Sequence, residues 1–492
     1  MSEEPAPTGT PTPASTPAPT STPASGPVPA PAPGASAETA RAPEAAETAG
    51  AAETGAARTM RTDRELRRVV TASVVGTALE WYDFFIYGTA VVLVFNDLFF
   101  VQDDPAAGTL IGLATFGVGF VFRPVGGFLF GALGDRIGRR STLVLTTLVM
   151  GLSTGVIGLL PTYATIGVAA PVLLTLMRVC QGLGAGAEFG GASTLLAEHA
   201  PAERRGFYAS FAQTGVQAGL VLGMVVFLFV GMIPEAGMRS WGWRLPFLLS
   251  FLLIAVSLYL RLRVAESPVF RRMQENRDVV KLPVREALRR YPRSFLVGVG
   301  AHICDTSVVY IYATFSVSYL TVQVEQPKWV ALTGVISFGI VVIALQPLYG
   351  ALSDRIGRRP LNLFSVIFTG LFAYPFFLLL DTGVPVVIWL AMIVATSLGL
   401  APMIAVQPVF YAELFGARVR YTGFAASRET GAALAGFSPF VAAALLGYAD
   451  GDPWLVAAFM AATAAVSLVA FWYSEESRQT DVGLAEREAP AR

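Results

Sequence analysis

Ionisable side chains are rare within the long apolar stretches of this sequence, and the first two have a spacing that could serve proton transfer. Glu80 and Asp83 are three residues apart, so a helix would present them on one face. Two carboxylates close together away from water cannot both ionise easily, and one of them is expected to hold a proton. The pair could therefore load and release protons. The alternative is that one carboxylate only accepts structural hydrogen bonds from Tyr82, Tyr87 or a neighbouring helix.

Arginines occur within two later apolar stretches. Arg123 lies in the second stretch, and Arg178 lies in the fourth with Gln181 one helical turn on and Glu188 further along. An arginine stays charged inside a membrane, so each must meet a carboxylate, a carbonyl or a bound anion. We expect Arg123, Arg178 and Gln181 to bind an anionic solute. Glu188 is a candidate for proton coupling, and fixed buried ion pairs are the alternative for these residues.

The second half of the chain carries charged groups of the same kind. His302 and Asp305 are again three residues apart, and Asp305 is a candidate for proton coupling. His can titrate near neutral pH, although a single His in a helix is more often structural. Arg428 and Glu429 are adjacent, so on a helix their side chains point about 100° apart and are not expected to pair with each other. Both are candidates for solute binding, Arg428 by a bidentate contact with a carboxylate, unless it forms a lock with Asp135 of the first half.

These residues belong to twelve apolar segments, each long enough at about 1.5 Å per residue to cross about 30 Å of hydrocarbon. An open sheet could not cross it, because lipid satisfies no backbone polar group. The sequence predicts an all-α membrane protein in which twelve transmembrane helices form two pseudo-symmetric bundles of six. The expected segments are 69–95, 108–132, 141–160, 167–196, 206–233, 244–262, 294–321, 329–352, 360–380, 384–412, 422–447 and 454–473.

The connections between the segments predict the orientation and the domains. Arginines concentrate after the even-numbered segments, so the positive-inside rule puts both termini in the cytoplasm and the chain in the inner (plasma) membrane. The first residues are rich in Pro, Ala and Thr and are expected to be disordered. The expected domains are a cytoplasmic tail (1–65), a six-helix bundle (66–262), a cytoplasmic linker (263–293), a second bundle (294–474) and a second tail (475–492).

Composition excludes several function classes. Charged residues make up 14% of the chain, whereas a soluble domain carries about 25%. The formal net charge is zero, so we expect no nucleic-acid partner. The phosphate-binding pattern G-x-x-x-x-G-K does not occur, so we expect no ATP-driven pumping. Cys180 and Cys304 both lie in apolar stretches, and we expect no metal, no cofactor and no enzyme activity.

A short sequence is repeated between the second and third segments of each half. Residues 131–140 read GALGDRIGRR and residues 350–359 read GALSDRIGRR, so nine of ten positions match. Repeats on this scale are typical of secondary transporters, which bind solute between the repeats. The loop motif is expected to gate access, because its Asp could face a helix N-terminus of the other half and its arginines could pair with glutamates. The expected gating residues are Gly131, Asp135, Arg136, Gly138, Arg139, Arg140, Glu198, Asp354, Arg355, Gly357, Arg358, Arg359 and Glu413. These residues could instead only fix the topology.

The loop motif is that of the major facilitator superfamily, which the chain resembles over about residues 66–475. More closely, it resembles the metabolite:proton symporter family, which includes carriers of shikimate, 2-oxoglutarate, citrate and proline or betaine. The shared motifs are EWYDFFIYG at 80–88, FRPVGG at 122–127, RVCQGLGAGAE at 178–188, WGWRLPF at 241–247 and ESPVF at 266–270. The resemblance implies alternating access and places Arg178 in proton transfer or solute binding.

Two departures from the family leave the solute open. Asp305-Thr306 stands where related carriers often have Glu-Asn, and Arg428-Glu429 stands where shikimate-like members have uncharged side chains. Tyr82 and Tyr310 are the aromatic candidates for solute contact. The sequence predicts a monomeric proton symporter in the lipid bilayer that takes up a small carboxylate metabolite such as shikimate or a dicarboxylate, with H⁺ as the coupling ion. The alternatives are a proline/betaine symporter with an osmosensing role, and a facilitator or exporter on the same fold.

Overall fold

The computed structural model of the chain describes residues 41–100, 105–137, 139–186, 188–262, 283–416 and 419–478, and every regular element among them is a helix. Contacts divide the chain into two units, residues 1–61 and residues 62–492, and every site residue belongs to the second. The prediction of an all-α protein is confirmed for the described residues.

The first half of the chain forms helices whose longest members match the expected segments. They are α1 (Arg41–Ala90), α2 (Asn96–Leu98), α3 (Pro105–Ile137), α4 (Arg139–Ile157), α5 (Tyr163–Ile166), α6 (Ala169–Ala185), α7 (Glu188–His199), α8 (Arg205–Ala209), α9 (Phe211–Val230), α10 (Glu235–Gly237) and α11 (Arg244–Arg261). Helix α1 begins at Arg41, inside the segment 1–65 that was expected to be disordered. Residues 41–60 are rich in Ala and Glu, which favour helix, and this propensity was underweighted.

The second half repeats this arrangement after the expected linker, of which residues 263–282 lie outside the described part of the chain. Its helices are α13 (Pro283–Arg290), α14 (Pro292–Tyr310), α15 (Ser316–Val322), α16 (Lys328–Ile356), α17 (Arg358–Leu380), α18 (Pro385–Val394), α19 (Ala401–Leu414), α20 (Arg420–Ala435), α21 (Ser438–Tyr448) and α22 (Trp454–Tyr473). The first helix of each half continues into a π-helical turn, at Val91–Phe95 and at Ile311–Phe315. Such turns are rare and often lie near functional sites.

Eleven helical stretches in the described residues are long and apolar enough to cross a membrane. They match eleven of the twelve expected segments. The exception is the expected segment 141–160, where the apolar helix covers only Ser141–Ile157. Gly158 and the two residues after it form a turn that ends this helix early.

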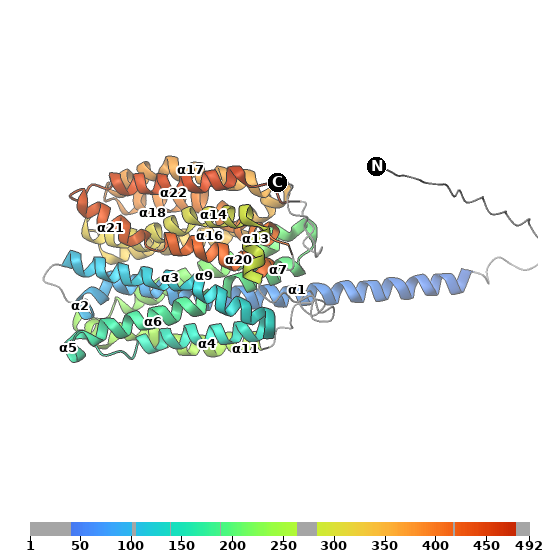
Figure 1. The fold of residues 1–492 in the computed structure, drawn as a ribbon, viewed down its shortest axis with the longest axis horizontal. Coiled ribbons are helices and arrows are strands. Elements are labelled where there is room, and N and C mark those ends of the chain that lie inside the picture. The colour runs from blue at the N-terminus through green and yellow to red at the C-terminus, as the bar shows by residue number, and fades with distance from the viewer. Residues whose placement is uncertain are drawn as a thin grey trace, which may run out of the picture. The chain divides into compact units, whose positions relative to one another are not determined.

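The helices of the second unit form two groups that correspond to the two halves. Helices α3, α4, α6 and α11 lie together, and helices α14, α16, α17, α18 and α22 lie together beside them (Figure 1). The halves meet where α16 packs against α9 and where α20 packs against α3. The contact is very close at Gly350, because a Cβ built there would lie 2.6 Å from the Gly206 carbonyl oxygen of the other half. Glycine at this position therefore lets the two backbones touch.

Candidate functional site

A small cavity lies between the two halves. Helices α1, α3 and α9 line it from the first half, and α14, α19 and α20 line it from the second half. The lining residues are Trp81, Phe85, Phe120, Arg123, Gln213, Val216, Gln217, His302, Asp305, Thr306, Val309, Tyr310, Ile404, Gln407 and Arg428. We call this space the solute cavity.

Two arginines of the solute cavity share one carboxylate. Arg123 Nη1 of α3 lies 3.6 Å from Glu429 Oε2 of α20, so this ion pair joins the two halves. Arg428 also forms an ion pair with Glu429, although a fixed helix would point adjacent side chains about 100° apart. The expectation that neighbours would not pair is wrong, because the flexible Arg428 side chain bends back to the carboxylate. Two cations thus share one anion, and Asp305 is a second carboxylate in the lining of the same cavity.

The opposite wall of the solute cavity carries a hydrogen-bonded polar group around Gln407 of α19. Gln407 Nε2 donates to Asp305 Oδ2 at 2.5 Å, and Asp305 also lies 2.8 Å from His302 Nδ1. Gln407 Oε1 accepts a hydrogen bond of 2.8 Å from Gln213 Nε2 in the first half. Gln407 therefore links the His302–Asp305 pair to the other half of the molecule, with Arg428 as a further donor at 3.4 Å.

Aromatic rings surround the guanidinium groups of the solute cavity. The Arg123 guanidinium carbon lies 4.3 Å from the ring centre of Phe84, 4.9 Å from that of Phe120 and 5.1 Å from that of Trp81. Stacking on rings stabilises a buried guanidinium without neutralising it. The Tyr310 hydroxyl is buried and has no hydrogen-bond partner among the described residues, and it lies in the lining of the solute cavity.

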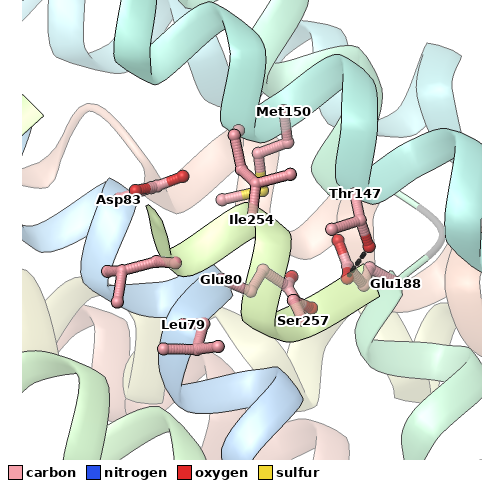
Figure 2. Close-up of a pocket in the computed structure, with 10 residues that line it drawn as sticks. Leu79, Glu80, Asp83, Thr147, Met150, Glu188, Ile254 and Ser257 are labelled. Carbon is pink, nitrogen blue, oxygen red and sulfur yellow. Dashed lines mark hydrogen bonds between the residues drawn. The ribbon is translucent and has the colours of Figure 1, made fainter. Parts of the chain in front are cut away.

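A second cavity, of about 270 Å³, lies inside the first half alone (Figure 2). We call it the bundle cavity. It is lined by Leu79, Glu80, Asp83, Thr147, Met150, Gly151, Glu188, Leu253, Ile254 and Ser257. Glu188 forms an ion pair with Arg261 and accepts a hydrogen bond of 3.0 Å from Thr147 Oγ1. Asp83 accepts a hydrogen bond of 2.6 Å from Ser250 Oγ.

The structure thus brings Glu80, Asp83 and Glu188 together, and it brings Arg123, Asp305, Tyr310, Arg428 and Glu429 together in a different place. Four predicted solute ligands are absent from both linings, and one of them, Glu429, contacts the lining arginines Arg123 and Arg428. The other three are Arg178, Gln181 and Tyr82. Arg178 donates to Gln181 Oε1 at 2.8 Å and to the Phe116 carbonyl at 3.0 Å. Its guanidinium lies over the Tyr87 ring at 4.1 Å. Tyr82 donates to the Pro246 carbonyl at 2.7 Å and packs against α11. These contacts lie within the first bundle, and a solute role for Arg178, Gln181 and Tyr82 stays a prediction.

The loop motif of the second half forms the expected contact with the first half. Asp354 Oδ1 accepts from the backbone N–H of Gly206 at 2.8 Å, and Asp354 Oδ2 accepts from that of Phe207 at 2.9 Å. Arg358 pairs with Asp354 at 2.8 Å and with Glu413 at 3.2 Å. The carboxylate thus meets positively polarised backbone N–H groups at a helix start, as predicted. The halves also meet on the other side of the solute cavity, where a Cβ built at Gly117 would lie 2.3 Å from Phe437 Cδ1.

The other residues that were predicted to gate access divide between this network and positions outside the described part of the chain. Gly357 has φ of +103° and starts the turn before α17. Arg359 Nη2 donates to the Trp472 carbonyl at 2.7 Å, and the Arg355 carbonyl accepts from Arg478. Glu198 lies 3.6 Å from Arg420 of the other half, and nothing approaches within 4 Å of a Cβ built at Gly131. The side chains of Asp135, Arg136, Arg139 and Arg140, together with Gly138, lie outside the described residues.

Sequence reasoning missed a short segment after α22 that joins the Asp354–Arg358–Glu413 network. Glu476 accepts from the backbone N–H groups of Arg358 at 2.9 Å and Arg359 at 3.0 Å. Ser477 Oγ donates to Glu413 Oε2 at 2.6 Å, inside the same network. The sequence did contain a signal for this segment. The dipeptide Glu266-Ser267 after the sixth expected segment recurs as Glu476-Ser477 after the twelfth. Gln213, Gln407 and Arg261 were also missed, since no motif marks them.

A helical membrane protein built from two repeats around a central polar cavity has the architecture of a secondary transporter. The family model of the Major Facilitator Superfamily matches residues 73–437 and 294–492. The chain is 37% identical to the shikimate transporter of Escherichia coli, over 84% of this chain and 95% of that protein. It is 40% identical to the inner membrane metabolite transport protein YhjE of the same organism, over 84% and 94%.

Other relatives and solved structures agree. The proline/betaine transporter of E. coli is 35% identical over 79% of each chain. The xylose transporter XylE of E. coli, in a partially occluded inward-open conformation, superposes with a TM-score of 0.66 at 18% identity, over 85% of this chain and all of that one. The chain belongs to the Major Facilitator Superfamily and is a multi-pass membrane transporter. Its resemblance to the metabolite:proton symporter family is confirmed by these relatives.

Proposed function

We propose that this protein is a proton-coupled symporter that takes up a small organic carboxylate by alternating access. The observation that carries the proposal is the group formed by Arg123, Arg428 and Glu429 in the solute cavity. Two guanidinium groups from different halves converge on one carboxylate there. A solute carboxylate offers the same two oxygens, so it can replace Glu429 as their partner.

A solute carboxylate that replaces Glu429 as the partner of the two arginines would couple solute binding to a change in the contacts between the halves. In the unliganded state the Arg123–Glu429 contact holds α3 against α20. A solute that takes over both arginines releases Glu429, while Gln407 and Tyr310 are placed to bind its hydroxyl or second acidic group. The ligand then stabilises one conformation over another only through this difference in contacts. A buried carboxylate that has lost its arginine partners is unfavourable. Displacement of Glu429 by solute would therefore favour protonation of this carboxylate.

The transmembrane organisation we propose has twelve spans, with both termini in the cytoplasm of a bacterial plasma membrane. Helix α4 has 19 residues and is roughly 28 Å long, which is close to the hydrocarbon thickness. The cytoplasmic side is then the side of the loop motif, where Asp354 and Arg358 close the gate. We propose that a single chain is the transporting unit, since the cavity is formed within one chain.

Transport by reconstituted protein tests the proposal. Proteoliposomes with an imposed inward proton gradient should accumulate the solute, and collapsing the gradient with a protonophore should abolish accumulation. Accumulation that is unchanged after the collapse would rule out proton coupling. Equilibration without accumulation would indicate a facilitator, and efflux against the gradient would indicate an exporter on the same fold.

A second candidate solute is a zwitterion such as betaine or proline. The E. coli relative named proline/betaine transporter suggests this class. The rings of Trp81, Phe85, Phe120 and Tyr310 line the solute cavity together with Asp305. Aromatic faces and a carboxylate can bind a quaternary ammonium group while an arginine binds the carboxylate. A binding screen with shikimate, protocatechuate, 2-oxoglutarate, citrate and betaine separates these classes. Deleting residues 1–60 tests an osmosensing role, which unchanged activation by osmotic upshift would dismiss.

A further inference from the structure

Four side chains that line the solute cavity each have a buried polar atom without a hydrogen-bond partner among the described residues. The atoms are Trp81 Nε1, Arg123 Nε, Gln217 Oε1 and Tyr310 Oη, and none of the four residues is more than 5% exposed. A buried polar atom without a partner is unfavourable, so a solute that supplies the missing partner binds more tightly. The hydrogen-bonding chemistry of these atoms therefore indicates which groups the solute carries.

Gln217 differs from the other three residues in the partner that it needs. The indole N–H of Trp81 and the Nε–H of Arg123 can only donate, and the Tyr310 hydroxyl can donate or accept. An amide oxygen can only accept, so Gln217 Oε1 needs a donor. An ionised carboxylate has no N–H or O–H and cannot be that donor. A solute that is bound through its carboxylate therefore needs a second group to satisfy Gln217.

The packing of α9 determines the direction in which Gln217 points. Gly215 brings α9 against α1, since a Cβ built there would lie 2.6 Å from the Val74 carbonyl oxygen. Positions two apart on a helix differ by about 200°, so Gln217 points away from the side of α9 that touches α1. Gln213 lies one turn earlier on the same side as Gln217 and donates to Gln407 of the second half at 2.8 Å. Gln217 thus faces the boundary between the halves, where the solute cavity lies.

Trp81 lies at the part of the solute cavity that holds the two arginines. The centre of its ring is 5.1 Å from the guanidinium carbon of Arg123 and 6.0 Å from that of Arg428. These are the cations that the proposed function assigns to the solute carboxylate, so the unpaired Trp81 N–H is a further donor to the same carboxylate. Gln217 Oε1 accepts from neither arginine and stays available to the rest of the solute.

We propose that Gln217 determines solute specificity by selecting carboxylates that also carry a hydrogen-bond donor, either a hydroxyl or an N–H group. The inference rests on the proposed function, because it takes the carboxylate as the group that Arg123 and Arg428 bind. A solute without a donor leaves the Gln217 oxygen buried and unpaired, and a site of this kind discriminates strongly against such a solute. Betaine is one example, because its quaternary ammonium group has no N–H. A hydroxylated acid satisfies both the arginines and Gln217.

Calorimetric binding to the full-length protein in lipid nanodiscs, at one pH and without a gradient, tests the inference with matched pairs of solutes. The pairs are shikimate with cyclohex-1-ene-1-carboxylate, protocatechuate with benzoate, citrate with propane-1,2,3-tricarboxylate, and proline with N,N-dimethylproline. In each pair only the first compound has a donor besides its carboxyl groups. In the pair that contains the tightest ligand, the wild type should bind the donor-bearing compound roughly tenfold to a hundredfold more tightly. A ratio near one, or a tightest ligand without a donor, would overturn the proposal.

The Gln217→Leu variant tests whether Gln217 is the source of this preference. Leucine is similar in size but offers no acceptor, so the ratio of the two Kd values should fall to about one, chiefly because the donor-bearing compound binds more weakly. The matched control is Gln346→Leu, which makes the same change at a fully buried position of α16 outside the described lining of the solute cavity. The control should keep the wild-type ratio.

The outcomes separate this inference from the proposed function. A wild-type ratio that persists in Gln217→Leu, or that is lost equally in Gln346→Leu, would overturn the role of Gln217 and leave carboxylate transport standing. Absence of binding by all eight compounds would contradict the proposed function itself and the inference with it. Both leucine variants should elute as monodisperse protein, and the wild-type ratio alone still tests the selection for a donor if a variant does not fold.

Discussion

Removal of the negative charge at Glu429 should tighten solute binding. The Glu429→Gln variant keeps the shape of the side chain but takes away the anion that Arg123 and Arg428 share. At the observed 3.6 Å between Arg123 Nη1 and Glu429 Oε2, the Coulomb attraction is about 5 kcal/mol at an effective dielectric constant of about 20. A solute carboxylate must compete with this attraction in the wild type and need not do so in the variant.

Only part of this energy should be gained, because the amide still accepts a hydrogen bond and the free arginines are solvated by the cavity. We expect a net gain of about 1–3 kcal/mol, which is roughly fivefold to 150-fold in Kd. The assay is isothermal titration calorimetry on purified protein, with the solute that the wild type binds in the screen. The matched control is Glu235→Gln at an exposed position, which should leave Kd unchanged.

The same variant should lose the link between α3 and α20, so its gain in affinity should come with slower transport. The variant should bind solute tightly and transport it slowly, because Arg123 and Arg428 would then hold the solute without competition from Glu429. A Kd that is unchanged or weaker in Glu429→Gln would refute the idea that this carboxylate occupies the place of the solute.

Three more changes have expected outcomes. Gln407→Leu should lower solute affinity roughly tenfold and leave Asp305 and Gln213 without their shared partner, which binding and melting measurements would detect together. Glu476→Ala should weaken the gate, and distance measurements between spin labels on the two halves should show a larger open population; identical distributions would exclude a gating role for this segment. Tyr82→Phe should cost about 1 kcal/mol of stability and leave Kd unchanged, because its hydroxyl bonds the Pro246 carbonyl outside the solute cavity; a tenfold weaker Kd would put Tyr82 back among the solute ligands.

The sequence predicted those features that depend on local spacing or on repetition. The repeated decapeptide predicted the two halves, and the structure places the Asp354 contact where the repeat indicated. The spacing of Glu80 and Asp83 placed both on one face of α1, as observed. Local patterns sufficed there because helix geometry alone decides which side chains share a face.

The partners of the buried charges could not be predicted, because packing between distant helices decides them. Arg178 was expected to bind solute or take part in proton transfer, with a fixed ion pair as the alternative. In the structure Arg261 takes Glu188, and Arg178 lies among the rings of Phe84, Tyr87 and Phe116. Likewise, no spacing rule distinguishes the side of α1 that faces the bundle cavity from the side that faces the solute cavity. Only the three-dimensional arrangement separates one polar interior into two.

The most direct measurement of the proposed function compares wild type and Arg123→Gln in proteoliposomes under the same inward proton gradient. In the proposed function Arg123 is the first half's cation for a solute carboxylate; its partner in the structure, Glu429, lies across the interface. The wild type should concentrate the anionic solute inside the vesicles, and Arg123→Gln should fail both to bind it and to concentrate it while eluting as a folded protein. Equal accumulation by the two proteins would contradict solute binding between the halves.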